Sequence, residues 1–156
     1  MKAVLISTAV LILVASVTGL SLVYAQRQAT SLPENTPAHY IASRPTGKDR
    51  PVVVCIGDSI THGVVSANYI DAMASLGMDK YDLVNAGINS QLAYNINARI
   101  DEIVACDPDI VTVLVGTNDA KSTLSKEHEE RAIRDLALPQ APDADWYREN
   151  IKSIAE

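Results

Sequence analysis

The sequence predicts an α/β fold in which a parallel sheet is covered by helices on its faces. Three observations predict it. Short apolar runs alternate with segments of helical spacing, each run is followed by glycine, and the runs are apolar almost throughout. The chain has 156 residues, 47% of them hydrophobic, with 7 glycines and 7 prolines, as is typical of one folded domain.

The expected strands are residues 51–56, 81–86 and 110–115. The first is a β-branched run that ends at Gly57, and the second ends at Gly87. The third is apolar on both faces, so it needs a neighbour on each side, and a sheet that ended there would leave an edge prone to association.

The expected helices are residues 66–76, 92–104, 125–136 and 145–155. Gly77 is a stop signal for the first of these helices, and Pro108 follows the second. The second has the clearest amphipathic pattern, because its apolar residues recur every three or four positions. Trp146 and Tyr147 in the last helix are expected to be packing residues.

The first 25 residues predict an export signal or a membrane anchor. Lys2 is their one charged residue, and an apolar run over residues 3–25 follows it. The run is long enough for the roughly 20 residues that span a bilayer, so membrane attachment through residues 3–25 stays open. Both alternatives put the rest of the chain outside the cytoplasm. A buried core helix is a weaker third alternative.

Residues 26–50 are expected to be a linker, and residues 51–156 the folded domain. Pro33, Pro37, Pro45 and Gly47 interrupt the linker, which shows no apolar period. Its expected role is to space the domain from the membrane.

Composition excludes several kinds of partner and site. The net charge of −6 argues against a nucleic-acid partner, because phosphate binding needs a basic surface. Two cysteines are too few for a disulfide scaffold or a cysteine-based zinc site. Cys55 and Cys106 are expected to be free, buried thiols.

Polar residues follow all three expected strands, where ligand sites of parallel sheets lie. Ser59 can act as a nucleophile. The Ser59 N–H, the Gly87 N–H and the Asn118 amide can donate to the oxyanion of an acyl-transfer transition state. Each such donor is worth roughly 3–4 kcal/mol.

Each of these junctions taken alone has a simpler interpretation. A single Gly-Asp-Ser is often a capped turn, and Asn118 and Asp119 can be turn formers. Asp58 and Asp119 are expected to order the loops by hydrogen bonds to backbone, rather than to act as acids. The coincidence at three strand ends favours a catalytic site over three separate turns.

These blocks resemble the SGNH hydrolases, also called the GDSL esterase/lipase family. Residues 57–63 resemble the first block, with Ser59 as nucleophile, and Gly87 lies in the second. Ser90 stands where that block usually has a second glycine, and Asn118 is the side-chain donor of the third. The resemblance implies a flavodoxin-like three-layer α/β/α fold, no metal or cofactor, and hydrolysis of a small-molecule ester: a sugar ester, a lipid or a thioester.

The family's fourth block, Asp-x-x-His, is absent. A serine hydroxyl needs an adjacent base, and none of the three histidines has an aspartate three residues before it. His39 lies in the expected linker, His62 occupies a variable position of the first block, and His128 is expected on a solvated surface. We therefore expect a domain that is incomplete at its C-terminus, a fragment of a longer hydrolase, with the base missing.

Two functions of different kinds follow. The first is a serine ester hydrolase that is exported or membrane-tethered. The second is a catalytically inactive, membrane-tethered SGNH-like binding module. A phosphate or nucleotide binder is weaker, because the chain has no Gly-x-Gly-x-x-Gly and no Gly-Lys-Ser/Thr loop.

Overall fold

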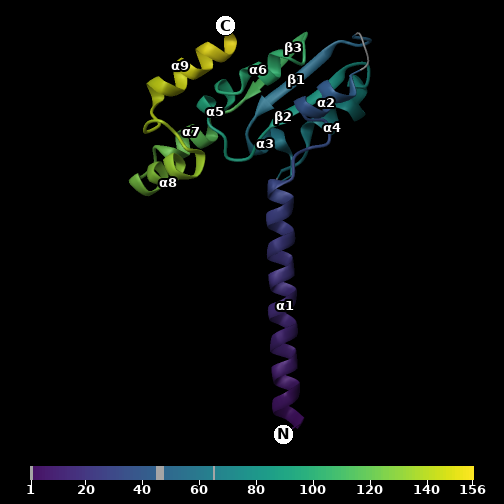
Figure 1. The fold of residues 1–156 in the computed structure, drawn as a ribbon, viewed down its shortest axis with the longest axis vertical. Helices are drawn as coiled ribbons and strands as arrows, with labels where there is room; N and C mark the ends of the chain where they lie inside the picture. Colours follow the sequence, from purple (N-terminus) through teal and green to yellow (C-terminus); the bar gives the residue numbers. More distant parts are fainter. Residues whose placement is uncertain (1, 45–47, 65) are drawn as a thin grey trace. The chain divides into compact units, whose positions relative to one another are not determined.

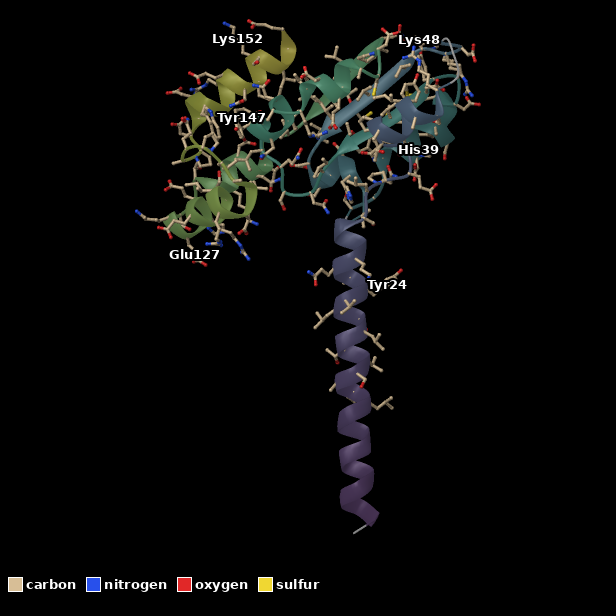
Figure 2. The ribbon with its side chains drawn as sticks, in the orientation of Figure 1. Tyr24, His39, Lys48, Glu127, Tyr147 and Lys152 are labelled. Carbon is tan, nitrogen blue, oxygen red and sulfur yellow. The ribbon has the colours of Figure 1, made fainter. Side chains whose placement is uncertain are left out.

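A computed structural model describes residues 2–44, 48–64 and 66–156 of the chain, which divides into two compact units, Met1–Ser31 and Leu32–Glu156. The first unit consists of helix α1 (Lys2–Thr30). Its described apolar side chains from Leu13 to Tyr24 are exposed (Figure 2). No helix in the described part of the chain meets the length and apolarity needed to cross a membrane. The assignment of residues 1–25 as a signal or anchor stays a prediction.

The second unit is built on a parallel sheet, which confirms the predicted fold class (Figure 1). Within the described residues the strand order is β2–β1–β3, for β1 (Val52–Gly57), β2 (Asp82–Gly87) and β3 (Ile110–Leu114). Gly57 pairs with Gly87 on one side and with Leu114 on the other. The carboxyl ends of the three strands are therefore level, which brings the segments that follow them to one edge of the sheet.

Helices cover both faces of β1, because successive side chains of a strand point to opposite faces. Val54 and Ile56 pack in one cluster with Ile96 and Ile103, whereas Val53 packs in the other. The first cluster involves the helices that contain Ile96 and Ile103, and the second involves the helix that contains Ile70. The bounds of these helices are α4 Tyr69–Met73, continued by η1 Ala74–Met78, then α5 Ala93–Asn97 and α6 Ile100–Val104.

Strand β3 leaves apolar side chains exposed at the edge of the sheet. Ile110, Val111, Val113 and Leu114 are 41–46% exposed. The sequence predicted that this strand needs a neighbour on each side, and in the described residues it has one, β1. Cys55 and Cys106 are free and buried, as predicted.

The expected helix 92–104 is divided into α5 and α6 at Arg99, whose backbone is not helical (φ −122°, ψ 22°). The Arg99 side chain reaches the end of β2, where Nη2 donates to the Ala86 carbonyl at 2.6 Å. This contact joins residues that are thirteen positions apart. The periodicity of the helix does not reveal it.

Residues 32–44, which fall in the expected linker, pack against the rest of the second unit. Asn35 borders β2: its carbonyl accepts from the Asn85 N–H at 2.8 Å, and its amide donates to the Leu83 carbonyl at 3.0 Å. Helix α2 (Pro37–Ser43) follows, and Tyr40 contacts the core. Pro45 and Gly47, which were part of the linker prediction, lie outside the described residues.

Three helices follow β3: α7 (Thr117–Ser122), α8 (Lys126–Leu136) and α9 (Ala144–Ala155). The last two match the predicted helices, whereas α7 was not predicted. Helix α9 packs against α5, where the Trp146 and Tyr94 rings stack at 4.8 Å between centroids. Tyr147 donates to the Val115 carbonyl at 3.3 Å, so the expectation that both aromatic residues serve packing is confirmed.

Candidate active site

Ser59 is the first residue of the short helix α3 (Ser59–His62), which follows β1 directly. Asp58 caps this helix, since its Oδ1 accepts from the Ile60 N–H at 3.0 Å. Asp58 is 1% exposed, and Ser59 is half-buried. The loop therefore holds the serine beside a buried, hydrogen-bonded carboxylate at the end of the central strand.

Gly87 lets α3 lie directly on the end of β2. A Cβ atom at Gly87 would be 2.2 Å from the His62 nitrogen and 2.6 Å from the Thr61 carbonyl carbon. Real Cβ atoms do not approach backbone that closely. The absence of a side chain therefore brings the segment that begins with Ser59 into contact with the loop that contains Gly87.

The Gly87 N–H already has a partner within its own loop. It donates to Asn85 Oδ1 at 2.9 Å, and both residues are buried. The Asn85 amide in turn reaches the His62 carbonyl at 3.5 Å. A substrate oxygen that used the predicted Gly87 donor would have to share it with Asn85.

Asn118 connects the three junctions. It is the second residue of α7, and its Nδ2 donates to Asp58 Oδ2 at 3.3 Å and to the Gln91 carbonyl at 3.1 Å. Asp58 lies in the segment after β1, and Gln91 in the segment after β2. The structure thus brings the side chain of Asn118 to the residue before Ser59.

The start of α7 is fixed by α9. Gly116, the residue before α7, has φ 130°, a conformation that favours glycine. A Cβ atom there would be 3.0 Å from the Tyr147 hydroxyl oxygen. Tyr147 therefore packs against the turn that precedes Asn118. Nothing in its sequence position near the C-terminus indicates this role.

Asp119 orders the loop before α5, as predicted. Its carboxylate oxygens lie 3.1 and 3.3 Å from the Ala93 nitrogen, which donates to them. Burial raises the pKa of the Asp119 carboxyl above its ordinary value, and the nearby Asp58 adds to the increase. The bond to Ala93 opposes this shift in pKa.

Replacing Asp119 with Asn is expected to change how stability depends on pH. A carboxyl whose pKa is raised by folding stabilises the folded state fully below its unfolded pKa, here 3.8, and this contribution is lost as the pH rises through the folded pKa. We expect the free energy of unfolding of the wild type, minus that of Asp119→Asn, to fall as the pH rises from below 3.8 toward neutrality. Urea titrations of both proteins measure it, and a difference that grows with pH contradicts it.

The loop after β2 has two features that the sequence pattern did not resolve. Ser90, in place of the second glycine, adopts φ 66°, in the left-handed region. Arg99 holds this loop, because its Nε donates to Gln91 Oε1 at 2.9 Å. Arg99 lies on the apolar face of the expected helix, at helical spacing from residues 92, 96 and 103. A charged residue on that face is the signal that could have shown that Arg99 contacts the loop after β2.

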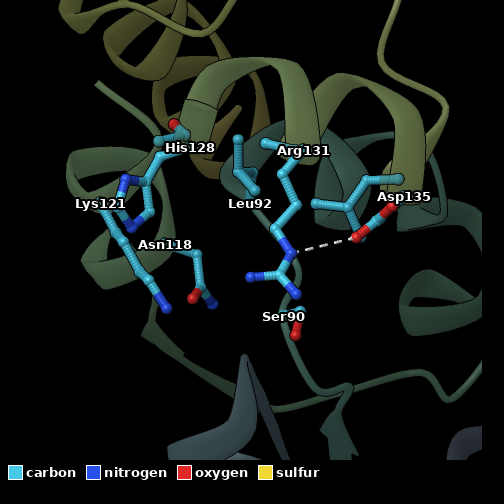
Figure 3. Close-up of a pocket in the computed structure, with 10 residues that line it drawn as sticks. Ser90, Leu92, Asn118, Lys121, His128, Arg131 and Asp135 are labelled. Carbon is cyan, nitrogen blue, oxygen red and sulfur yellow. Dashed lines mark ion pairs between the residues drawn. The ribbon is translucent and has the colours of Figure 1, made fainter. Parts of the chain in front are cut away.

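A pocket of about 300 Å³ adjoins this region (Figure 3). Asn118 lines it, whereas Ser59 and Gly87 do not. His128, expected on a solvated surface, also lines it, and its Nδ1 lies 2.7 Å from Ser125 Oγ. The remaining lining residues are Ser90, Leu92, Lys121, Ser122, Arg131, Ala132, Asp135 and Leu136.

The other two histidines lie in different surroundings. The ring of His39, in α2, contacts the Glu34 carbonyl. His62 is 2% exposed at the end of α3, and its N–H donates to the Asp58 carbonyl at 2.9 Å.

Comparison with known proteins gives a family match over most of the folded unit. Residues 55–155 match the model of the GDSL-like lipase/acylhydrolase family. No match to a curated protein sequence was found.

Solved structures share the fold. A GDSL-like lipase from Bacteroides thetaiotaomicron is 22% identical, with a TM-score of 0.52 over 76% of this chain and 48% of that chain. A catalytic mutant of an acetylxylan esterase from Geobacillus stearothermophilus is 19% identical, with a TM-score of 0.52 over 72% of this chain and 55% of that chain. The chain thus spans about half the length of these structures, and the likeness shows the fold alone.

Proposed function

The chain belongs to the GDSL-like lipase/acylhydrolase family, and we propose that it is a serine ester hydrolase that acts through an acyl-enzyme at Ser59. The observation that carries the proposal is the position of the Asn118 amide. It bonds to the residue before Ser59 and to the loop after Gly87, at 3.3 and 3.1 Å. This position supports the proposal that donors from three strand ends act on one carbonyl oxygen.

In the proposed reaction Ser59 Oγ attacks the ester carbonyl carbon, and its proton passes to a solvent water molecule. The alcohol takes a proton from water as its carbon–oxygen bond breaks, which leaves the acyl group on Ser59 Oγ. A second water then attacks the acyl carbon and breaks its bond to Oγ, which releases the acid and returns a proton to Ser59. The Ser59 N–H, the Gly87 N–H and the Asn118 amide would bind the oxyanion. Binding there would replace or share their present bonds to Asn85, Asp58 and Gln91.

The proposal assigns the base that takes the Ser59 proton to none of the three histidines. None has an aspartate three residues before it, and His128 has Ser125 Oγ as a neighbour at 2.7 Å. The base is therefore proposed to be missing from residues 1–156, and the reaction of this chain to be slow. A small-molecule ester is the proposed substrate, and residues 1–25 are proposed to direct the domain out of the cytoplasm or to anchor it.

The second candidate is a binding module that keeps the pocket without turnover. The bonds that Gly87 and Asn118 make within the chain favour it, because they occupy the donors in the absence of substrate.

A fluorophosphonate probe distinguishes the two candidates, because it reports one covalent event per molecule and so detects a reaction too slow for turnover assays. We expect slow, stoichiometric labelling at Ser59 and none in Ser59→Ala, with mass spectrometry locating the adduct. Labelling equal to that of Ser59→Ala, or located on another residue, contradicts the hydrolase proposal and favours the binding module.

A further inference from the structure

We infer that the pocket between α7 and α8 binds a carboxylate, and that the substrate is an ester with a carboxylate elsewhere in its acyl or alcohol part. The second half of this inference rests on the proposed function, because it takes Asn118 to contact the reacting carbonyl. The first half concerns the pocket alone.

Two helix faces and one loop form the pocket. Asn118, Lys121 and Ser122 lie on one face of α7, at spacings of three and four residues. Helix α8 contributes His128, Arg131 and Asp135 at the same spacings. Ser90 and Leu92 come from the loop after β2. Figure 3 shows the Arg131 side chain extending from α8 toward Ser90, with Asn118 and Lys121 on the facing helix.

The charge of the pocket is opposite to that of the chain. The chain has 13 basic and 19 acidic residues, yet Lys121 and Arg131 line the pocket with one carboxylate, Asp135. The acidic residues at the start of α8, Glu127, Glu129 and Glu130, do not line it.

Asp135 does not neutralise both cations. Its Oδ2 lies 3.6 Å from Arg131 Nε, and its Oδ1 lies 3.1 Å from Arg134 Nε, so two arginines share one carboxylate. Lys121 has no ion pair among the described residues. The contact between Arg131 and Asp135 is made at Arg131 Nε. An anion that enters the pocket therefore meets two positive groups.

A carboxylate fits these groups better than a neutral ligand does. The guanidinium of arginine binds carboxylates through two parallel N–H donors. Ser90 lines the pocket and can add a hydroxyl. Residues three apart on a helix have Cβ atoms roughly 5–6 Å apart. A carboxylate held by Lys121 therefore lies a few carbon–carbon bonds from a carbonyl held by Asn118.

Succinate binding, measured by calorimetry on the full chain, tests the pocket. We expect the wild type to bind succinate and not to bind dimethyl succinate. Arg131→Gln and Lys121→Gln are each expected to weaken succinate binding roughly tenfold. Lys126→Gln is the matched control, because it removes the same charge from the start of α8 but does not line the pocket. Equal weakening by Lys126→Gln, or no succinate binding by wild type, overturns the inference. Phosphate binding tighter than succinate binding overturns the choice of carboxylate.

The substrate class is tested with the protein in excess over two 4-nitrophenyl esters, the hemisuccinate and the acetate. We expect a hemisuccinate-to-acetate ratio of nitrophenol release that falls roughly tenfold in Arg131→Gln and is unchanged in Lys126→Gln. An unchanged ratio in Arg131→Gln overturns the assignment of the substrate.

Fluorophosphonate labelling of Ser59 in wild type reports the proposed function separately. Labelling of Ser59 without succinate binding refutes only the inference that the pocket binds a carboxylate. Succinate binding without labelling of Ser59 refutes only the proposal that the chain is a serine ester hydrolase.

Discussion

The 156-residue chain is expected to hydrolyse an activated aryl ester at least about 10⁴-fold more slowly than a family member that carries the Asp-x-x-His block. The hydroxyl of serine is a weak nucleophile at its own pKa, and a paired base makes it reactive. His39, in α2, lies against the Glu34 carbonyl, His62 is buried beside the end of β2, and His128 contacts Ser125. In the proposed mechanism the remaining rate would come from the proposed oxyanion donors alone.

Initial rates with 4-nitrophenyl acetate measure this difference, with Ser59→Ala giving the background. A full-length family member purified in the same way supplies the reference rate. His62→Gln and His128→Gln are expected to leave the slow rate of the chain within about twofold. A rate close to that of the reference, lost in either histidine variant, would show that the base is inside residues 1–156 and would refute the assignment.

Replacing Gly87 with alanine is expected to destabilise the second unit by about 3 kcal/mol, the upper end of the usual cost of overpacking. The new Cβ would lie 2.2 Å from the His62 nitrogen, and backbone cannot rotate away as a side chain can. Helix α3 must therefore move off the end of β2, and Ser59 must move with it. Loss of Ser59 labelling should accompany the loss of stability.

Urea unfolding followed by Trp146 fluorescence measures the effect, because this single tryptophan stacks on Tyr94 within the second unit. Gly77→Ala is the control. Gly77 has φ 99° but nothing within 4 Å of its added Cβ, so its cost comes from the backbone alone, about 1–2 kcal/mol. An unchanged unfolding midpoint in Gly87→Ala would contradict the close approach of α3 to β2.

The sheet could be predicted from the sequence because its signals are local. β-branched runs that end at Gly57 and Gly87 indicate buried strands, and their order implies parallel pairing. The meeting of Asp58 and Asn118 follows from that topology, since the ends of adjacent parallel strands share one edge of the sheet. These parts of the fold need no knowledge of distant contacts.

The parts that were not predicted depend on contacts between distant residues. Arg99 ends one helix and begins another by reaching Ala86, a carbonyl outside its own helix. The packing of residues 32–44 depends on hydrogen bonds between Asn35 and β2, one donated and one accepted by Asn35. The amino-acid composition of the segment cannot indicate these bonds. The pocket between α7 and α8 arises where two polar helices meet. Helix α7 was not predicted, and the periodicity of α8 gives its exposed face but not its neighbour.

The glycine at the end of β2 also bears on how relatives of this protein should be interpreted. Its lack of a side chain is needed for two backbone segments to touch, whether or not any ester is cleaved nearby. Selection for folding alone would preserve it in a pseudoenzyme that had drifted away from hydrolysis. A glycine at this position is therefore a marker of architecture, whereas under the proposed mechanism loss of the Ser59 hydroxyl or of the Asn118 carboxamide is the change that would signal lost chemistry.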